Sequence, residues 1–213
     1  MLEKNIFLKK KILIYGLGKS GTSSFNFLKN ISIIYIYDDN KNIVHDKIKK
    51  NFFIKHQDIK NKKFDYIIIS PGIDANKCNL KNYLKKNKLK IITDLDIFYN
   101  YFYKNLNITI TGTNGKSTTA KILFDILKDQ KWDVRLTGNI GKPILNERKV
   151  SLKTIFIIEA SSYQIEYTKN FKANFVILLN ITPDHLERHG TFYKYFKSKF
   201  KLIRNQTTEG FAF

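Results

Sequence analysis

The residues best suited to chemistry lie in the stretch ITITGTNGKSTT, residues 108–119. A β-branched apolar run leads through a glycine-containing turn to Lys116 and Ser117, which open a helix-compatible segment. Glycines let backbone N–H groups turn toward an anion, and the start of a helix adds unpaired N–H donors. In such a loop the lysine reaches the β- and γ-phosphates of a nucleotide, and the serine hydroxyl binds Mg²⁺. We therefore predict a phosphate-binding loop, although Ile110 stands where the general GxxxxGK[ST] pattern has its first glycine.

Two further groups of polar residues follow apolar runs in the same half of the chain. Glu159 ends the run 154–158, and a carboxylate at the end of a buried strand is well placed to bind Mg²⁺. The segment 182–190, TPDHLERHG, brings together two histidines and two acidic residues. Zinc remains an alternative ion there, but the segment has no cysteine and no HExxH spacing. A hard-cation site that shares the phosphates of a nucleotide fits these donors better.

A second glycine motif, GLGKSG at residues 16–21, follows the apolar run 11–15. A further apolar run, 33–37, ends in Asp38 and Asp39, about twenty residues beyond the glycines. This order of strand, glycine turn, helix, strand and acid predicts a Rossmann-like βαβ unit. NAD is one candidate ligand, and the diphosphate of any nucleotide satisfies the same geometry. A doubly wound domain with a tight glycine turn and no ligand is the alternative.

Strand-like and helix-like segments alternate along the whole chain, which predicts an α/β fold. We expect strands at 11–15, 33–37, 66–69, 89–92, 108–110, 133–136, 154–158 and 174–179, with a new strand beginning at 211–213. We expect helices at 22–28, 79–87, 94–103, 120–128 and 191–206, the last one amphipathic with most of its lysines facing solvent. The polar stretch 45–63 predicts a helix and a short strand, with His45 and His56 at the surface. The loop 104–107 marks a boundary between domains at 1–104 and 105–213.

Composition limits the class of protein. A chain of 213 residues with 43% hydrophobic and 14% aromatic residues can bury the cores of two small domains. No apolar run is long enough to span a membrane, and the N-terminus lacks the pattern of a signal peptide. The single cysteine, Cys78, excludes an internal disulfide and fits a reducing cytoplasm.

The formal net charge of +20 invites a nucleic-acid-binding interpretation. The lysines are, however, dispersed through nearly every segment together with Asn, Ile, Phe and Tyr, which indicates a general compositional bias acting on solvated faces. We therefore expect no nucleic-acid partner. A positive field should still attract polyanionic substrates such as nucleotides.

Eight short motifs occur in an order and spacing that resemble the Mur ligase family. They are GLGKSG, YDD, SPGI, DLDIF, GTNGKSTT, GNIGKP, EASSYQIE and NITPDHLERHG. The phosphate loop that departs from the general pattern matches the form found in this family. Folylpolyglutamate synthetases share that loop but lack an N-terminal Rossmann-like domain. The resemblance therefore implies a Rossmann-like domain followed by a P-loop ATPase domain that is incomplete at its C-terminal end.

The resemblance also implies particular site residues. The first domain would bind a UDP-sugar rather than NAD, through Gly18, Lys19, Ser20, Asp38, Asp39, Ser70, Pro71 and Gly72, with Asn139 contacting the muramoyl part. The second would bind ATP through Gly112, Thr113, Asn114, Gly115, Lys116, Ser117 and Thr118. Ser117 and Glu159 would bind one Mg²⁺, and His185 and Lys199 a second. Lys199 falls where the family carries a carbamylated lysine, and Lys116, His185 and Lys199 would serve catalysis.

The activity implied is an ATP-dependent acid–amino-acid ligase of peptidoglycan precursor synthesis, acting in the cytoplasm as a monomer. The N-terminal glycine turn and the SSYQ stretch favour the member that adds D-glutamate to UDP-N-acetylmuramoyl-L-alanine through an acyl phosphate. The alternatives are another member of the family, or a non-catalytic module that binds a UDP-sugar or nucleotide. Because family members continue well past residue 213, we expect this chain to be an N-terminal part that cannot complete the reaction alone.

Overall fold

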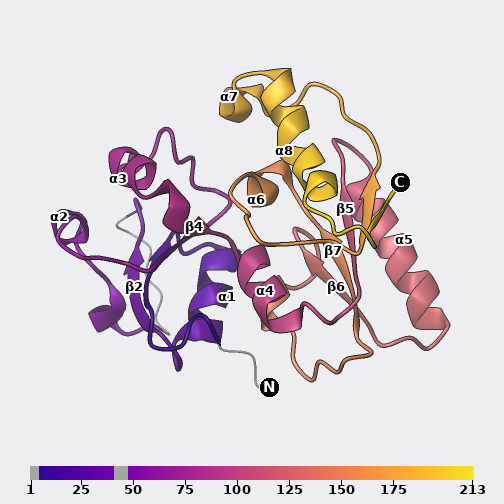
Figure 1. The fold of residues 1–213 in the computed structure, drawn as a ribbon, viewed down its shortest axis with the longest axis horizontal. Helices are drawn as coiled ribbons and strands as arrows, with labels where there is room; N and C mark the ends of the chain where they lie inside the picture. The colour runs from indigo at the N-terminus through magenta and orange to yellow at the C-terminus, as the bar shows by residue number, and fades with distance from the viewer. Residues whose placement is uncertain (1–4, 41–47) are drawn as a thin grey trace.

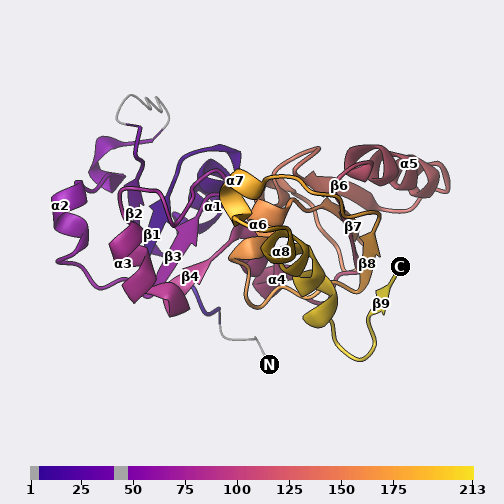
Figure 2. The same cartoon turned by 90° about the horizontal axis from the view of Figure 1, so that it is seen from above.

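The structure is a computed structural model that describes residues 5–40 and 48–213. Its described elements build two parallel β-sheets, which lie side by side along the long axis of the molecule (Figure 1, Figure 2). The first sheet belongs to the N-terminal half and the second to the C-terminal half. The predicted α/β class is confirmed, whereas the boundary between residues 104 and 105 stays a prediction. His45 lies outside the described residues.

The first sheet has the strand order β2-β1-β3-β4, and its paired strands are parallel. Its strands are β1 (Lys11–Tyr15), β2 (Ile33–Tyr37), β3 (Tyr66–Ile69) and β4 (Ile91–Ile92). Its helices are α1 (Lys19–Leu28), α2 (His56–Ile59), α3 (Lys81–Lys86) and α4 (Asp94–Phe102). The central strand β1 is buried from its second residue onward, as expected of a parallel strand covered on both faces. Strand β4 is shorter than predicted because a 3₁₀ turn occupies Lys88–Lys90.

The second sheet has the order β6-β7-β5-β8-β9, and its paired strands are also parallel. Its strands are β5 (Asn107–Thr111), β6 (Val134–Gly138), β7 (Ile155–Glu159), β8 (Phe175–Leu178) and β9 (Phe211–Ala212). Its helices are α5 (Lys116–Asp129), α6 (Ser162–Glu166), α7 (Leu186–His189) and α8 (Phe192–Arg204). The strand predicted to begin near residue 211 is therefore present. Helices α6 and α7 were not predicted, because four or five residues are too few to show helical periodicity.

An aromatic cluster joins the two halves. Phe98 of α4 packs against Phe156 of β7 with ring centroids 4.8 Å apart, and it also contacts Phe171. A hydrogen bond also crosses the junction: the Ser23 hydroxyl of α1 donates to the Asn146 side chain at 2.9 Å. The halves thus share one continuous core, so packing fixes their relative orientation.

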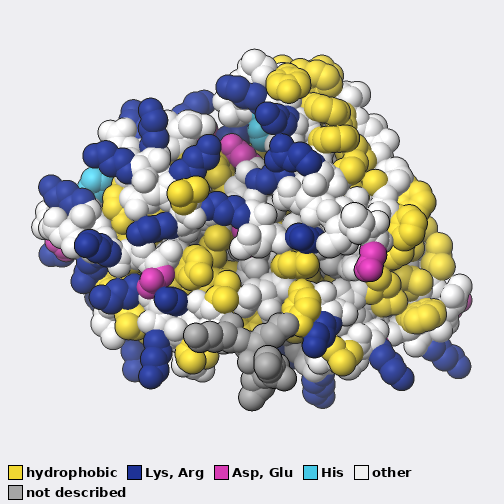
Figure 3. Space-filling model, in the orientation of Figure 1, with side chains coloured by type: hydrophobic (Ala, Val, Ile, Leu, Met, Phe, Trp, Pro, Cys, Tyr) yellow, Lys and Arg dark blue, Asp and Glu magenta, His cyan; other side chains and the backbone are white. Residues whose placement is uncertain are grey.

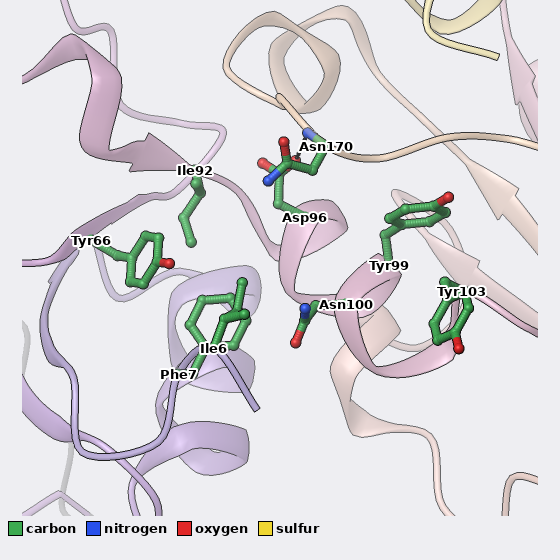
Figure 4. A pocket seen from close by; sticks show the side chains of 9 residues that line it. All are labelled: Ile6, Phe7, Tyr66, Ile92, Asp96, Tyr99, Asn100, Tyr103 and Asn170. Carbon is green, nitrogen blue, oxygen red and sulfur yellow. Dashed lines mark hydrogen bonds between the residues drawn. The ribbon is translucent and has the colours of Figure 1, made fainter. Parts of the chain in front are cut away.

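A buried carboxylate strengthens this junction. Asp96, only 3% exposed, accepts a hydrogen bond from the Thr93 backbone at 2.9 Å through Oδ2. Its Oδ1 accepts from three successive backbone N–H groups, those of Lys169, Asn170 and Phe171, at 2.7, 2.7 and 3.2 Å (Figure 4). Hydrogen bonds to an ionised acceptor are about twice as strong as neutral ones. We call this set of contacts the Asp96 clasp.

A pocket of about 290 Å³ opens beside the Asp96 clasp (Figure 4). It is lined by Ile6, Phe7, Tyr66, Ile92, Asp96, Tyr99, Asn100, Tyr103 and Asn170. Both oxygens of its single carboxylate already accept hydrogen bonds, so its wall offers mainly aromatic, aliphatic and amide surface. The residues predicted to do chemistry lie elsewhere.

Candidate functional site

The predicted phosphate loop connects β5 to α5. Gly115 has φ +85°, a left-handed conformation that side chains other than glycine adopt at a cost, and it directly precedes α5. The helix starts at Lys116, four residues earlier than predicted, so its unpaired N–H groups face the loop. This geometry is that of an anion-binding site at a helix N-terminus.

The loop is held from outside by the segment that follows β8. The backbone N–H groups of Thr113 and Asn114 donate to the backbone and side-chain oxygens of Asn180, each at 2.9 Å. The Thr113 hydroxyl also lies 3.0 Å from the Tyr195 hydroxyl of α8 and accepts from the backbone of Thr182. Thr113 and Asn114, predicted to bind nucleotide, therefore also shape the loop.

Two lysine ammonium groups lie against the same loop. Lys116 Nζ donates to the Thr113 carbonyl at 2.7 Å, and Lys199 Nζ donates to the Gly112 carbonyl at 2.8 Å. Lys199 is only 2% exposed, and its Nζ lies 4.7 Å from the centre of the Tyr195 ring. Burial, together with the nearby charge of Lys116, lowers the pKa of Lys199 to about 8.

The prediction that most lysines of the last long helix face solvent is only half right. Lys194 and Lys197 are exposed, whereas Lys199 is buried and Lys201 is partly buried, with its Nζ donating to the Glu166 carbonyl at 3.0 Å. Lys199 lies on the same helix face as Tyr195 and the other buried residues of α8, which accounts for its burial.

Glu159 ends β7 directly beside the phosphate loop. It is 1% exposed, and its Oε2 accepts from the Ser117 hydroxyl at 2.8 Å while Oε1 accepts from the Asn139 amide at 3.0 Å. Adjacent ligands of an octahedral Mg²⁺ lie about 2.9 Å apart, given metal–oxygen distances of about 2.0–2.1 Å. The spacing of the Ser117 and Glu159 oxygens therefore fits a shared divalent cation.

His185 precedes α7 in a left-handed conformation, with φ +52°. Its ring lies 4.8 Å from that of Tyr163, and its two nitrogens lie 3.5 and 3.7 Å from carboxylate oxygens of Asp184 and Glu187. The second histidine of the segment, His189, is buried, and its Nε2 lies 3.0 Å from the Ser162 hydroxyl. Burial lowers the pKa of His189. The two histidines therefore have different environments and do not form one pair of ligands.

One pocket is lined by residues of both halves of the molecule. It has a volume of about 340 Å³ and is lined by Pro71, Gly72, Lys116, Asn139, Ser161, Ser162, Tyr163, His185, Tyr195 and Lys199. Glu159 adjoins it through its hydrogen bond with Asn139. Across residues 5–40 and 48–213, no group of three or more His, Cys, Asp and Glu side chains is arranged to hold a metal. A cation here would therefore need the Ser117 hydroxyl, phosphate oxygens or a modified lysine as further ligands.

The N-terminal glycine turn lies between β1 and α1. Gly18 and Lys19 are exposed at the start of α1, and a Cβ placed on Gly18 would meet nothing within 4 Å. Ser20 is half-buried and hydrogen-bonds the buried Asp94 side chain, whose pKa burial raises. Asp38 Oδ2 accepts from the backbone of Leu17 at 2.7 Å, so the acid at the end of β2 fixes the turn.

Two predicted substrate residues have structural partners. Ser70 is 6% exposed, and its hydroxyl donates to the Gly16 carbonyl at 2.7 Å, so it braces the glycine turn and does not line the pocket described above. Asp39 Oδ2 accepts from the Tyr15 hydroxyl at 2.8 Å. The neighbouring Asp38 lines a separate pocket with the aromatic residues Tyr37 and Phe53.

Four residues that line the pocket were not predicted as site residues: Ser161, Ser162, Tyr163 and Tyr195. Arg188 does not line the pocket, but its guanidinium carbon lies 4.8 Å from the centre of the Tyr163 ring. The only signal for them in the sequence is their position within motifs or on the apolar face of a helix.

On the face that Figure 3 shows, the basic side chains are dispersed, as the sequence predicts. Lys and Arg side chains are spread over the face seen in Figure 3, interrupted by polar and apolar surface, and do not form one stripe. Within the part of the chain that the structure describes, no helix is both long and apolar enough to cross a membrane.

Two family models match the chain. The model of the Mur ligase middle domain matches residues 110–213, and a model described as C2185-like, N-terminal, matches residues 8–92. Curated proteins named UDP-N-acetylmuramoylalanine–D-glutamate ligase are 36% identical in Rickettsia bellii, 36% in Caldicellulosiruptor bescii and 34% in Elusimicrobium minutum. These alignments cover 97%, 95% and 100% of this chain but 46%, 46% and 49% of the relatives. The chain thus spans about half the length of the curated relatives it matches.

Two solved structures share the fold. The UDP-N-acetylmuramate:L-alanyl-gamma-D-glutamyl-meso-diaminopimelate ligase of Neisseria meningitides aligns with a TM-score of 0.57 at 16% identity, over 95% of this chain and 70% of that one. The UDP-N-acetylmuramate-alanine ligase of Thermotoga maritima aligns with a TM-score of 0.51 at 18% identity, over 96% of this chain and 49% of that one. At such low identity these likenesses bear on the fold alone, and they confirm a Rossmann-like domain followed by a P-loop domain.

Proposed function

The chain belongs to the Mur ligase family, and we propose that it supplies the UDP-sugar site and the ATP phosphate site of a D-glutamate-adding ligase. The observation that carries this proposal is the pocket shared by both halves, where Pro71 and Gly72 meet Lys116, His185 and Lys199. A carboxylate substrate held by the first half and a triphosphate held by the second would meet there.

The first half would bind the UDP part of the substrate. Gly18, Lys19 and Ser20 would approach the diphosphate, because they form the N-terminus of α1, where Gly18 and Lys19 are exposed. Asp38 lines a pocket with Tyr37 and Phe53, whose rings offer surface on which a uracil base would stack. Asp39 would lie close to the same base, and Asn139 would contact the muramoyl part.

The second half would bind ATP through residues 112–118. Lys116 would leave the Thr113 carbonyl and contact the phosphates, since its present hydrogen bond lies within the loop. Ser117 and Glu159 would hold one Mg²⁺, and His185 would belong to a second site. A bound Mg²⁺ neutralises phosphate charge and polarises the γ-phosphoryl group.

In the proposed reaction the substrate carboxylate attacks the γ-phosphorus and ADP leaves, which gives an acyl phosphate. The amine of D-glutamate then attacks the acyl carbon, inorganic phosphate leaves, and the amine loses a proton. The residues of this chain orient the carboxylate and neutralise the charge that builds up on the phosphoryl oxygens.

Lys199 would carry a carbamate that contributes to the second metal site. Only a neutral amine reacts with CO₂, and the lowered pKa of about 8 gives Lys199 a much larger neutral fraction at pH 8 than an ordinary lysine has. The intact mass of the protein in bicarbonate buffer, compared with that of Lys199→Arg, tests this point. A carbamate adds about 44 Da to the unsubstituted chain only.

Ligand binding provides the direct test. Titration calorimetry should detect UDP-N-acetylmuramoyl-L-alanine and Mg²⁺–ATP on the same chain, with UDP-sugar affinity that survives moderate salt. A binding module would take only one of the two ligands. A basic nucleic-acid binder would instead prefer arbitrary duplexes, with an affinity that falls steeply as salt rises.

Turnover tests the catalytic assignments. We expect no D-glutamate-dependent release of ADP from residues 1–213 alone. In a chain extended to the length of the relatives, Lys116→Ala and His185→Ala should each abolish most turnover. Lys121→Ala is the matched control, because Lys121 is exposed on α5 and pairs with Asp125 of the same helix. Near-normal turnover in Lys116→Ala or His185→Ala would refute the role given to that residue.

We further propose that the protein is a monomer that acts in the cytoplasm.

A further inference from the structure

Arg188 connects the two halves of the molecule at the edge of the shared pocket. Its side chain is 7% exposed, although it belongs to the four-residue helix α7. Helix α7 lies over the junction between the two sheets in both views of the ribbon (Figure 1, Figure 2). A buried guanidinium must be paired to offset its loss of hydration, so its hydrogen-bond partners show which segments of the chain it connects.

The partners of Arg188 come from both halves. Its Nη2 donates to the backbone carbonyl of Ile73, in the N-terminal half, at 2.8 Å. Nη2 and Nε also donate to Glu166 Oε2 of α6 at 3.2 and 3.3 Å, and Asp74 Oδ1 lies 3.9 Å away. The flat face of the guanidinium lies 4.8 Å from the Tyr163 ring. We call this set of contacts the Arg188 bridge.

One end of the Arg188 bridge is part of the turn that enters the pocket. Ile73 donates its backbone N–H to the Ser70 carbonyl, so Ser70, Pro71, Gly72 and Ile73 form one closed turn. Pro71 and Gly72 of that turn line the shared pocket. Any shift of the turn upon binding of the UDP-sugar must therefore change the position of the Ile73 carbonyl relative to Arg188.

The other end of the bridge reaches His185 through the Tyr163 ring. The backbone N–H groups of Arg188 and His189 donate to the His185 carbonyl at 3.1 and 3.0 Å. The Tyr163 ring contacts the Arg188 guanidinium and, at 4.8 Å between ring centres, the His185 imidazole. The position of the Arg188 side chain therefore limits where the His185 ring can lie.

We propose that Arg188 is a positioning residue that couples the two pockets: occupancy of the UDP-sugar site fixes His185 for the metal–nucleotide site. This inference rests on the proposed function. Arginine suits the task because its planar fork donates to Ile73 and Glu166 together, whereas the single ammonium of lysine cannot reproduce both directions. A merely structural role would affect folding or both affinities, but not their interdependence.

The test measures the dissociation constant of Mg²⁺–ADP with and without saturating UDP-N-acetylmuramoyl-L-alanine. In the wild-type chain the UDP-sugar should tighten nucleotide binding by about 5-fold or more, within the usual range of coupling between sites. Arg188→Lys and Arg188→Met should bring this ratio close to 1, while each ligand alone binds within about 3-fold of wild type. Arg204→Met is the matched control, because Arg204 is exposed at the end of α8.

Hydrogen exchange provides a second readout. Binding of the UDP-sugar alone should slow amide exchange in α7 of the wild type but not in α7 of Arg188→Lys. Arg188→Lys also keeps the test possible if Arg188→Met fails to fold. Equal coupling ratios in the wild type and Arg188→Lys would overturn the proposal. A wild-type chain that binds both ligands with a ratio of 1 would also overturn it, yet leave the proposed function intact. A wild-type chain that binds neither ligand would instead refute the proposed function.

Discussion

The molecule contains two glycine loops with the same strand–loop–helix order, but they are held in different ways. The turn between β1 and α1 is closed by its own backbone: a Cβ on Gly21 would lie 1.9 Å from the Gly16 carbonyl oxygen. Ser70 and Asp38, from the neighbouring strands of the same sheet, then fix that turn by hydrogen bonds. The first loop is therefore held in shape by contacts within its own sheet.

The loop between β5 and α5 is held instead largely by side chains, together with one backbone hydrogen bond from Thr113 to Asn180. Lys116 and Lys199 donate to its carbonyls, and Asn180 and Tyr195 bind it from other elements. A Cβ on Gly115 would come no closer than 3.4 Å to Leu179. The same sequence pattern thus gives a turn closed by its own backbone in one place and a turn contacted by two lysine ammonium groups in another.

The two loops should differ most in how much a substitution within them lowers the free energy of unfolding. Gly21→Ala should destabilise the fold by about 3 kcal/mol, because its methyl group would overlap backbone atoms that cannot move aside. Gly115→Ala should cost only about 1–2 kcal/mol, since it meets a backbone penalty at φ +85° but no clash. Urea denaturation measures both values. Equal costs would contradict the difference drawn between the loops.

The next effect concerns nucleotide affinity. Lys116→Met should weaken Mg²⁺–ATP binding by about 10- to 100-fold, the range for loss of one charge-assisted hydrogen bond. The thermal midpoint should change little, because the Lys116 ammonium is only partly buried and donates to a carbonyl of its own loop. Lys121→Met, on the exposed face of the same helix, is the control. Unchanged affinity in Lys116→Met would show that the second loop does not bind the phosphates.

A smaller effect tests whether the first loop binds a diphosphate. Gly18→Ala should leave stability within about 0.5 kcal/mol of wild type, because no atom lies within 4 Å of the added methyl group. The affinity for the UDP-sugar should nevertheless fall about 10-fold, since the methyl group would occupy space needed by the phosphates. Calorimetric titration measures the affinity. Normal affinity would remove Gly18 from the proposed site.

The weakest effect that we predict is a pH dependence of the stability of the fold, which arises from His189 of α7. Burial lowers the pKa of His189 in the folded state below its unfolded value of about 6.5. The unfolded chain therefore binds the proton more tightly, and stability declines as pH falls through 6.5 toward the folded pKa. His189→Gln keeps a hydrogen-bonding group near Ser162 but cannot titrate. Between pH 7.5 and 5.5 the wild-type thermal midpoint should fall more than that of the variant; parallel curves would contradict this assignment.

The sequence predicted most of the parallel strands, because strands buried on both faces appear as continuous apolar runs such as 11–15 and 154–158. It also predicted the phosphate loop from the order of its residues. The bounds of α5 were wrong because propensity alone does not reveal that Lys116 already has a helical backbone. The sequence could have predicted which side of α8 is buried, because Tyr195, Lys199 and Leu202 recur at helical spacing.

What the sequence did not reveal concerns tertiary contacts. Ser70 was predicted to bind substrate, and that role stays a prediction; its hydrogen bond across 54 residues is a structural contact that the sequence did not show. The contacts of Arg188 also depend on segments distant in sequence, which no local pattern encodes. The DLDIF motif gave no hint that its second acid would bind three N–H groups of another segment.

That second acid, in the Asp96 clasp, has a consequence for substrate choice. The Asp96 carboxylate accepts hydrogen bonds from three consecutive backbone amides, and these bonds oppose movement of the segment 93–96 relative to the segment 168–171. We therefore expect the distance between the two glycine loops to stay nearly constant when a ligand binds. A molecule that reaches from one loop to the other would then be selected by its length.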